Sequence, residues 1–83
     1  AHSGAMKDDI LRILWRVPAD LTLSRHLLRA QLAADSGTVP GDGELNAALA
    51  EMLRDGWLVS TRNRRTGDEE LALTALGREV FES

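Results

Sequence analysis

The sequence contains no cysteine, and it has only three aromatic residues, Trp15, Trp57 and Phe81. Without cysteine, disulfide bonds and thiolate metal sites are excluded. No apolar run approaches the roughly 20 residues needed to span a bilayer. Ala1 to Met6 has neither the basic start nor the apolar stretch of a signal peptide. These absences predict no membrane association and make the cytoplasm the expected location.

Basic residues are also in the minority, with 10 Lys+Arg against 13 Asp+Glu and a net charge of −3. A dedicated DNA-binding domain usually has a basic balance or a clear basic face, so the net charge counts mildly against nucleic acid. The distribution of charge matters more than its sum. A hydrophobic content of 43% is ordinary for a globular chain, and 83 residues allow one domain with a shallow core.

The first six residues are small, polar and patternless. We interpret residues 1–6 as a tag remnant or disordered tail, and residues 7–83 as the domain. A first helix is predicted from Lys7 to Val17, because Pro18 ends it. Its apolar positions follow the i, i+3, i+4, i+7 spacing of an amphipathic helix at Ile10, Ile13, Leu14 and Val17.

Two more helices are predicted in the middle of the chain. Residues 21–23 suggest a short strand, and Ser24 is a good N-cap for a helix from 25 to about 34. Its apolar face is predicted to be Leu27, Leu28 and Leu32, with Arg25, Arg29 and Gln31 pointing outward. After a turn at 38–43, a third helix is predicted over 44–55. Its buried stripe is predicted to be Leu45, Ala48, Leu49, Met52 and Leu53.

A β-hairpin is predicted after Gly56, which suits the left-handed residue that ends many helices. Its strands are predicted at 57–63 and 69–73, and its tip at 64–68, where Gly67 can adopt a positive φ. Thr74 is predicted to cap a last helix, from 75 to about 82.

This order of elements resembles the winged helix-turn-helix domain of bacterial regulators, and two motifs strengthen the likeness. The first, Leu53-Arg54-Asp55-Gly56-Trp57-Leu58, resembles the junction between recognition helix and wing. The second, Leu71-Ala72-Leu73-Thr74-Ala75-Leu76-Gly77, resembles the end of the wing in MarR-like and PadR-like regulators. The resemblance covers about residues 7–82. It implies a small α+β fold with a three-helix core, a short strand, a two-stranded β-hairpin wing and a short C-terminal helix.

The resemblance also implies a DNA-binding function for this chain. The helix over 24–35 would lie across the DNA backbone, the helix over 44–55 would enter the major groove, and the wing over 62–68 would reach phosphates or the minor groove. The implied wing contacts are Arg62, Arg64 and Arg65. The implied helix contacts are Arg25, Arg29, Asn46 and Arg54. The alternative for the wing arginines is a solvated hairpin tip that resists edge pairing.

One departure from the pattern favours an alternative function. The third helix and its cap carry Asp42, Glu44, Glu51 and Asp55 against a single Arg54, which would repel phosphates. The helix could instead dock a protein partner. The face that would do so comprises Glu44, Ala47, Ala50 and Glu51. An exposed tryptophan within an apolar patch would also favour an interface.

The long dimerisation helices of MarR-like and PadR-like proteins are also lacking here. This leaves open an excised domain, a monomer, or a homodimer that pairs differently.

No enzymatic activity, metal or cofactor is expected. Catalysis would need a nucleophile with a base, paired carboxylates in a cleft, or a metal cluster. Outside the first six residues the only histidine is His26. The close acidic pairs Asp8-Asp9 and Glu69-Glu70 are explained by helix capping and strand edges.

Overall fold

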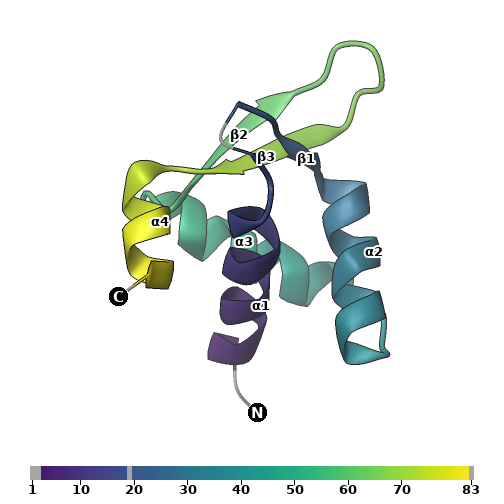
Figure 1. Ribbon diagram of the computed structural model, residues 1–83. Coiled ribbons are helices and arrows are strands. Elements are labelled where there is room, and N and C mark those ends of the chain that lie inside the picture. The colour runs from purple at the N-terminus through teal and green to yellow at the C-terminus, as the bar shows by residue number, and fades with distance from the viewer. Residues whose placement is uncertain (1–2, 19, 83) are drawn as a thin grey trace.

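The computed structural model describes residues 3–18 and 20–82 of the chain. In this part of the chain, a three-stranded antiparallel sheet packs against a group of helices (Figure 1). The elements follow the order α1 (Ser3–Trp15), β1 (Leu23–Ser24), α2 (Arg25–Ser36), α3 (Asp42–Arg54), β2 (Leu58–Arg62), β3 (Glu69–Leu73) and α4 (Ala75–Glu82). The predicted α+β fold is therefore confirmed, with three core helices, a short strand, a hairpin and a short last helix.

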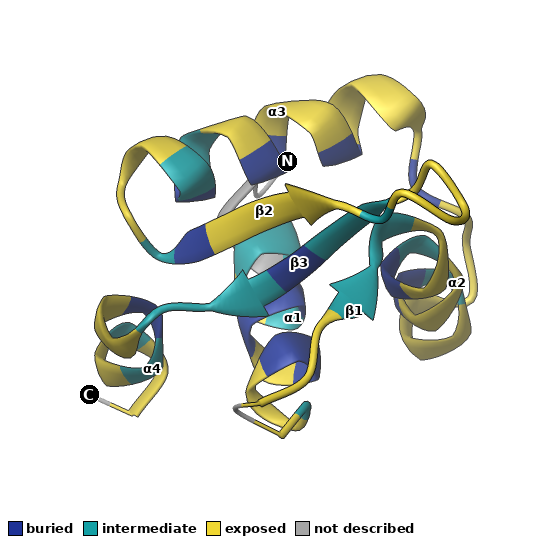
Figure 2. Cartoon of the chain, turned by 90° about the horizontal axis from the view of Figure 1, so that it is seen from above, coloured by how far each residue is buried: buried dark blue, intermediate teal, exposed yellow. Residues whose placement is uncertain are grey.

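The central strand of the sheet is β3, and the strand order is β1-β3-β2 (Figure 2). Leu71 on β3 is opposite both Leu23 on β1 and Ser60 on β2, and it is fully buried. Leu58 and Leu73 are also paired, so one face of the hairpin carries leucines towards the helices. The short strand β1 thus finds the partner that it needs in β3.

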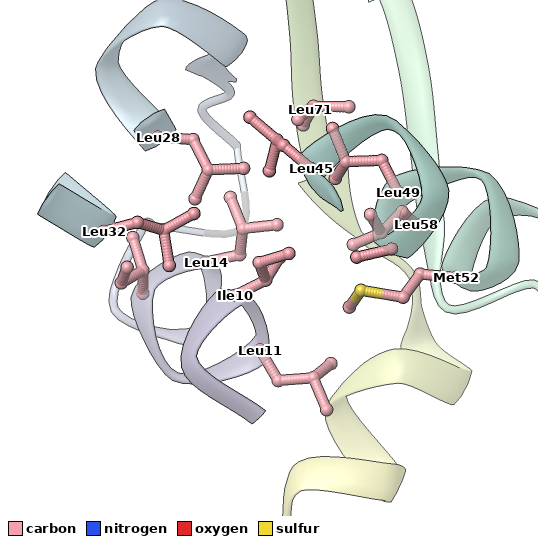
Figure 3. Packing of buried hydrophobic residues seen from close by; sticks show 12 residues of the cluster. Ile10, Leu11, Leu14, Leu28, Leu32, Leu45, Leu49, Met52, Leu58 and Leu71 are labelled. Atoms are coloured by element: carbon pink, nitrogen blue, oxygen red, sulfur yellow. The ribbon is translucent and has the colours of Figure 1, made fainter. Parts of the chain in front are cut away.

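The core is built from the inward faces of α1, α2 and α3 and from the inner face of the sheet (Figure 3). Its largest fully buried side chains are Ile10, Leu14, Leu28, Leu45, Met52 and Leu71. Burial of each such side chain contributes about 1.5–3 kcal/mol of hydrophobic free energy. The predicted stripes of the first and third helices are confirmed, except that Leu53 is half-buried and Val17 packs from outside the helix.

The first helix differs most from its predicted bounds. It begins at Ser3 and ends at Trp15, where Pro18 follows a short turn with Val17 N donating to Leu14 O. Met6 packs against the core, because the apolar side of the helix continues one turn towards the N-terminus. Residues 1 and 2 lie outside the described residues, and the origin of residues 1–6 stays a prediction.

The second helix corrects one predicted core residue. Leu27 is 55% exposed, whereas Leu28 and Leu32 are buried. Successive residues of a helix differ by about 100°, so a stripe centred on Leu28 and Leu32 turns its neighbour outward. Ser24 caps this helix as predicted, because its Oγ accepts from Leu27 N at 3.1 Å. The helix ends later than predicted, at Ser36, before the left-handed Gly37.

Smaller shifts affect the remaining elements. The strand β1 starts two residues after the predicted position, and α3 starts two residues earlier than predicted, with Gly41 at its N-cap. The predicted left-handed conformations of Gly56 and Gly67 are confirmed, with φ of 81° and 78°. Within the described chain, no helix is long and apolar enough to cross a bilayer.

The two sequence motifs meet in space at the base of the hairpin. The Thr74 hydroxyl donates to the Gly56 carbonyl oxygen at 2.6 Å and accepts from Gly77 N at 3.0 Å. Thr74 N donates to Trp57 O at 2.9 Å. One threonine therefore caps α4 and joins it to the end of α3, which fixes the hairpin relative to the third helix.

Candidate nucleic-acid interface

The tip of the hairpin is organised by Asn63. Its side-chain oxygen accepts from Arg65 N at 2.9 Å and from Thr66 N at 3.3 Å. Its backbone N–H donates to Asp68 O, and its carbonyl accepts from Gly67 N. An asparagine that bonds to backbone groups two or three residues ahead stabilises a turn. Asn63 is predicted to end the strand over 57–63, and that prediction lacks this role, although an asparagine before a polar, glycine-containing segment signals such a turn.

The three predicted wing arginines lie on or next to this tip. Arg62, Arg64 and Arg65 are exposed, and within the described residues none of them forms an ion pair. Figure 1 shows the tip extending beyond the helices on the side of α2. The tip therefore presents a cluster of solvated guanidinium groups on a turn held by hydrogen bonds. The role of these residues in DNA binding stays a prediction.

The two arginines of α2 are in a different state. Arg25 Nη1 lies 3.8 Å from Glu69 Oε1, and Arg29 Nη1 lies 2.8 Å from Asp42 Oδ1. Both side chains point away from the core, as predicted, but each is half-buried beside its carboxylate. The reason is that the fold places Glu69 of β3 and Asp42 of α3 beside these arginines, which the sequence pattern of α2 alone does not reveal.

A groove of about 430 Å³ lies where the start of α2, the start of α3 and the hairpin meet. It brings together three of the residues predicted to contact DNA, Arg25, Arg29 and Asn46. Its other lining residues are His26, Asp42, Gly67, Asp68 and Glu69. A smaller cavity of about 270 Å³ connects Arg25 with Arg62. Exposed Arg54 is not part of this groove, because it lies eight residues after Asn46, or about 12 Å further along α3.

The negative charge of α3 is partly neutralised by the fold. Asp42 pairs with Arg29, and Glu51 Oε2 lies 3.1 Å from Lys7 Nζ on α1. Glu44 and Asp55 are exposed and form no ion pair within the described residues. The predicted repulsion between α3 and phosphates is therefore weaker than the sequence suggests, because two of the four carboxylates already face a cation.

An exposed aromatic pair lies away from this groove, between the first and last helices. Trp15 is 40% exposed and Phe81 is 36% exposed, with ring centroids 5.4 Å apart. Trp15 Nε1 donates to Glu82 Oε2 at 3.3 Å. Trp57, by contrast, is half-buried against the core. Trp15 is thus the more exposed of the two tryptophans and the one more accessible to a partner protein.

The described part of the chain has no candidate site for a metal ion. No group of three or more His, Cys, Asp or Glu residues there could hold a metal ion.

Comparison with known proteins gives similar structures but no similar sequences. No family model matches the chain, and no curated protein matches it. Among the solved structures similar to this chain are RosR from H. salinarum, a transcriptional regulator from Clostridium thermocellum, and a proposed transcriptional regulator from Thermoplasma acidophilum. Their TM-scores are 0.81, 0.80 and 0.76, and their sequence identities are 20%, 16% and 17%.

The alignments cover 94%, 95% and 95% of this chain and 66%, 75% and 73% of the three matched chains. This chain thus spans less than two thirds of the RosR chain. At such identities the likeness concerns fold, and the assignment to MarR-like or PadR-like bacterial regulators stays a prediction. The chain therefore shares its small α+β fold of helices and a three-stranded antiparallel sheet with these three proteins.

Proposed function

We propose that this domain binds double-stranded DNA, either as part of a transcriptional regulator or as the DNA-contacting module of a larger protein. The observation that carries the proposal is the hairpin tip. Arg62, Arg64 and Arg65 lie on or next to this tip within four positions, exposed and without a carboxylate partner in the described chain. Guanidinium groups that are free to leave water for phosphate oxygens are the main source of non-specific DNA affinity.

The geometry suggests how the remaining residues would take part. Gly67 and Asp68 of the hairpin line the same groove as Asn46, so a duplex on the wing would bring a base edge near Asn46. An asparagine side chain can donate to and accept from adenine in the major groove. The wing would contribute most of the affinity, because Glu44 on α3 and Asp55 just after it have no cationic partner in the described chain. The similarity to two chains described as regulators, one of them only proposed to be one, supports this reading.

The test is a titration of a labelled generic duplex, followed by fluorescence anisotropy near 50 mM salt and at higher concentrations. The unmodified domain is expected to bind, with an affinity that falls as salt rises. Replacing Arg64 and Arg65 with alanine should weaken binding to all sequences. The slope of log K against log[salt] should flatten by about 0.9 for each lost phosphate contact.

A matched control removes the same charge from another element. Arg12 on α1 and Arg16 just after its end are exposed, and their double alanine variant changes the net charge by the same amount. It should keep the salt slope of the unmodified domain. NMR shifts on DNA addition should centre on residues 62–68. An absence of binding near 50 mM salt, where electrostatic contacts are strong, would refute the proposal for this domain.

A second candidate function is protein association, which the exposed Trp15–Phe81 pair favours. Aromatic side chains with one exposed face are common anchors of interfaces. The predicted docking face on α3, which comprises Glu44, Ala47, Ala50 and Glu51, stays a prediction beside it. Sedimentation over a range of concentrations would test self-association, and alanine at Trp15 should abolish any dimer that uses this pair. A dimer that survives this substitution would exclude the pair as its interface.

A further inference from the structure

The ion pair between Arg29 and Asp42 connects α2 to the first residue of α3 at the edge of the proposed DNA groove. Arg29 Nη1 and Asp42 Oδ1 are 2.8 Å apart. Both residues line the groove, together with Asn46 and the hairpin residues Asp68 and Glu69. A phosphate that enters the groove would therefore need the position beside Arg29 that the Asp42 carboxylate already occupies.

This pair is of a kind that exchanges readily. One carboxylate oxygen contacts one guanidinium nitrogen, so it lacks the two parallel bonds of the strongest arginine pairs. The Asp42 side chain is 71% exposed, and solvent stabilises its charge when the pair opens. Arg29 Nε is buried without a hydrogen-bond acceptor in the described chain. Asp42 thus pairs with the guanidinium group of Arg29, while the Nε donor of that group has no acceptor in the described chain.

The charges around the groove decide what an approaching phosphate meets. Two arginines, Arg25 and Arg29, face three carboxylates, on Asp42, Asp68 and Glu69. With His26 neutral, the lining carries one net negative charge. The α2 arginines therefore attract a phosphate only if a carboxylate moves aside or is removed, unlike the arginines of the hairpin tip.

We propose that Asp42 competes with DNA backbone phosphate for Arg29, and so limits how much α2 contributes to DNA affinity. This inference rests on the proposed function. While Asp42 holds Arg29, the domain meets DNA through its wing, and its affinity for generic duplex stays low. When Asp42 is neutralised, Arg29 becomes an additional phosphate contact.

The experiment compares Asp42→Asn with Glu44→Gln in the anisotropy titration. Both substitutions remove one negative charge from the first turn of α3, but of these two carboxylates only Asp42 pairs with an arginine in the described chain. Asp42→Asn should tighten binding to generic duplex by about threefold to tenfold and steepen the salt slope by about 0.9, the value for one added phosphate contact. Glu44→Gln should tighten binding less and leave the slope unchanged.

A second comparison uses Arg29→Ala as the background. If Asp42 acts through Arg29, the effect of Asp42→Asn should shrink there to that of Glu44→Gln. Thermal unfolding checks that each variant is folded, and Asp42→Ser replaces Asp42→Asn if the latter is not.

The outcomes separate the two proposals. Equal effects of Asp42→Asn and Glu44→Gln, with equal salt slopes, would overturn the competition while DNA binding stands. A full Asp42→Asn effect without Arg29 would overturn it too. An absence of binding by every variant would remove the proposed function, and the competition with it.

Discussion

The backbone of Gly77 lies against the carbonyl group of Trp57, so that a Cβ atom at position 77 would overlap the Trp57 oxygen and lie 3.1 Å from the carbonyl carbon. The same oxygen accepts from Thr74 N at 2.9 Å, which holds it in place. The first turn of α4 can therefore approach the start of the hairpin closely only with glycine at position 77. This contact gives a physical reason for the glycine that ends the second sequence motif.

Replacing Gly77 with alanine should destabilise the domain by about 2–3 kcal/mol, because the clash is with backbone and not with the end of a flexible side chain. The measurement is the free energy of unfolding from urea denaturation. Gly43 is the control, since it lies in α3 with no atom near the position of its Cβ. Alanine there should stabilise by about 0.5–1 kcal/mol. Equal behaviour of the two variants would refute the close approach.

Replacing Thr74 with valine should cost about 1–2 kcal/mol of stability, because it removes both the bond to Gly56 O and the cap of Gly77 N while it keeps the shape of the side chain. Serine at the same position retains the hydroxyl and should restore most of the loss. Thermal unfolding of both variants gives the comparison. A valine variant as stable as the serine variant would contradict the assigned role of the hydroxyl.

Replacing Asn63 with alanine should loosen the hairpin tip and leave the core intact. The Arg65 and Thr66 amides would lose their acceptor, so their hydrogen exchange should become faster. The loss of global stability should stay below about 1 kcal/mol, because the site is near the surface. If the proposed function holds, DNA affinity should fall with an unchanged salt slope, since all three arginines remain. Unchanged exchange at both amides would contradict the role given to Asn63.

Neighbouring leucines on α2 should respond very differently to truncation. Alanine at Leu28, which is fully buried, should destabilise by about 2–5 kcal/mol. Alanine at Leu27, which is 55% exposed, should change stability by less than about 0.5 kcal/mol. Urea denaturation of the two single variants tests this directly. A large loss at Leu27 would mean that its side chain is covered in solution.

Local patterns in the chain were sufficient for most of the fold. Capping and glycine signals predicted the N-cap Ser24, the left-handed Gly56 and the cap Thr74, because each depends on backbone groups only a few residues away. The strand at Glu69–Leu73 was predicted with its observed bounds. The error at Leu27 arose where three leucines lay close together and the pattern did not specify which of them would face inward.

The candidate site likewise has features that local sequence predicts and features that only the fold shows. Clustering within a few positions identified Arg62, Arg64 and Arg65 without knowledge of the fold. Local sequence could not show that Asp42 lies 2.8 Å from Arg29, or Glu51 3.1 Å from Lys7, because these partners are 13 and 44 residues apart in the chain.

The sequence by itself thus determined the order of helices and strands and the basic tip of the hairpin. Side-chain periodicity and turn chemistry are local properties that any fold must satisfy. Only the tertiary structure decided which arginines are already paired and which acids are neutralised. It also decided that Trp15 meets Phe81 at the surface. These pairings depend on how helices and strands pack against one another, and that packing brings together charges and rings that no local pattern relates.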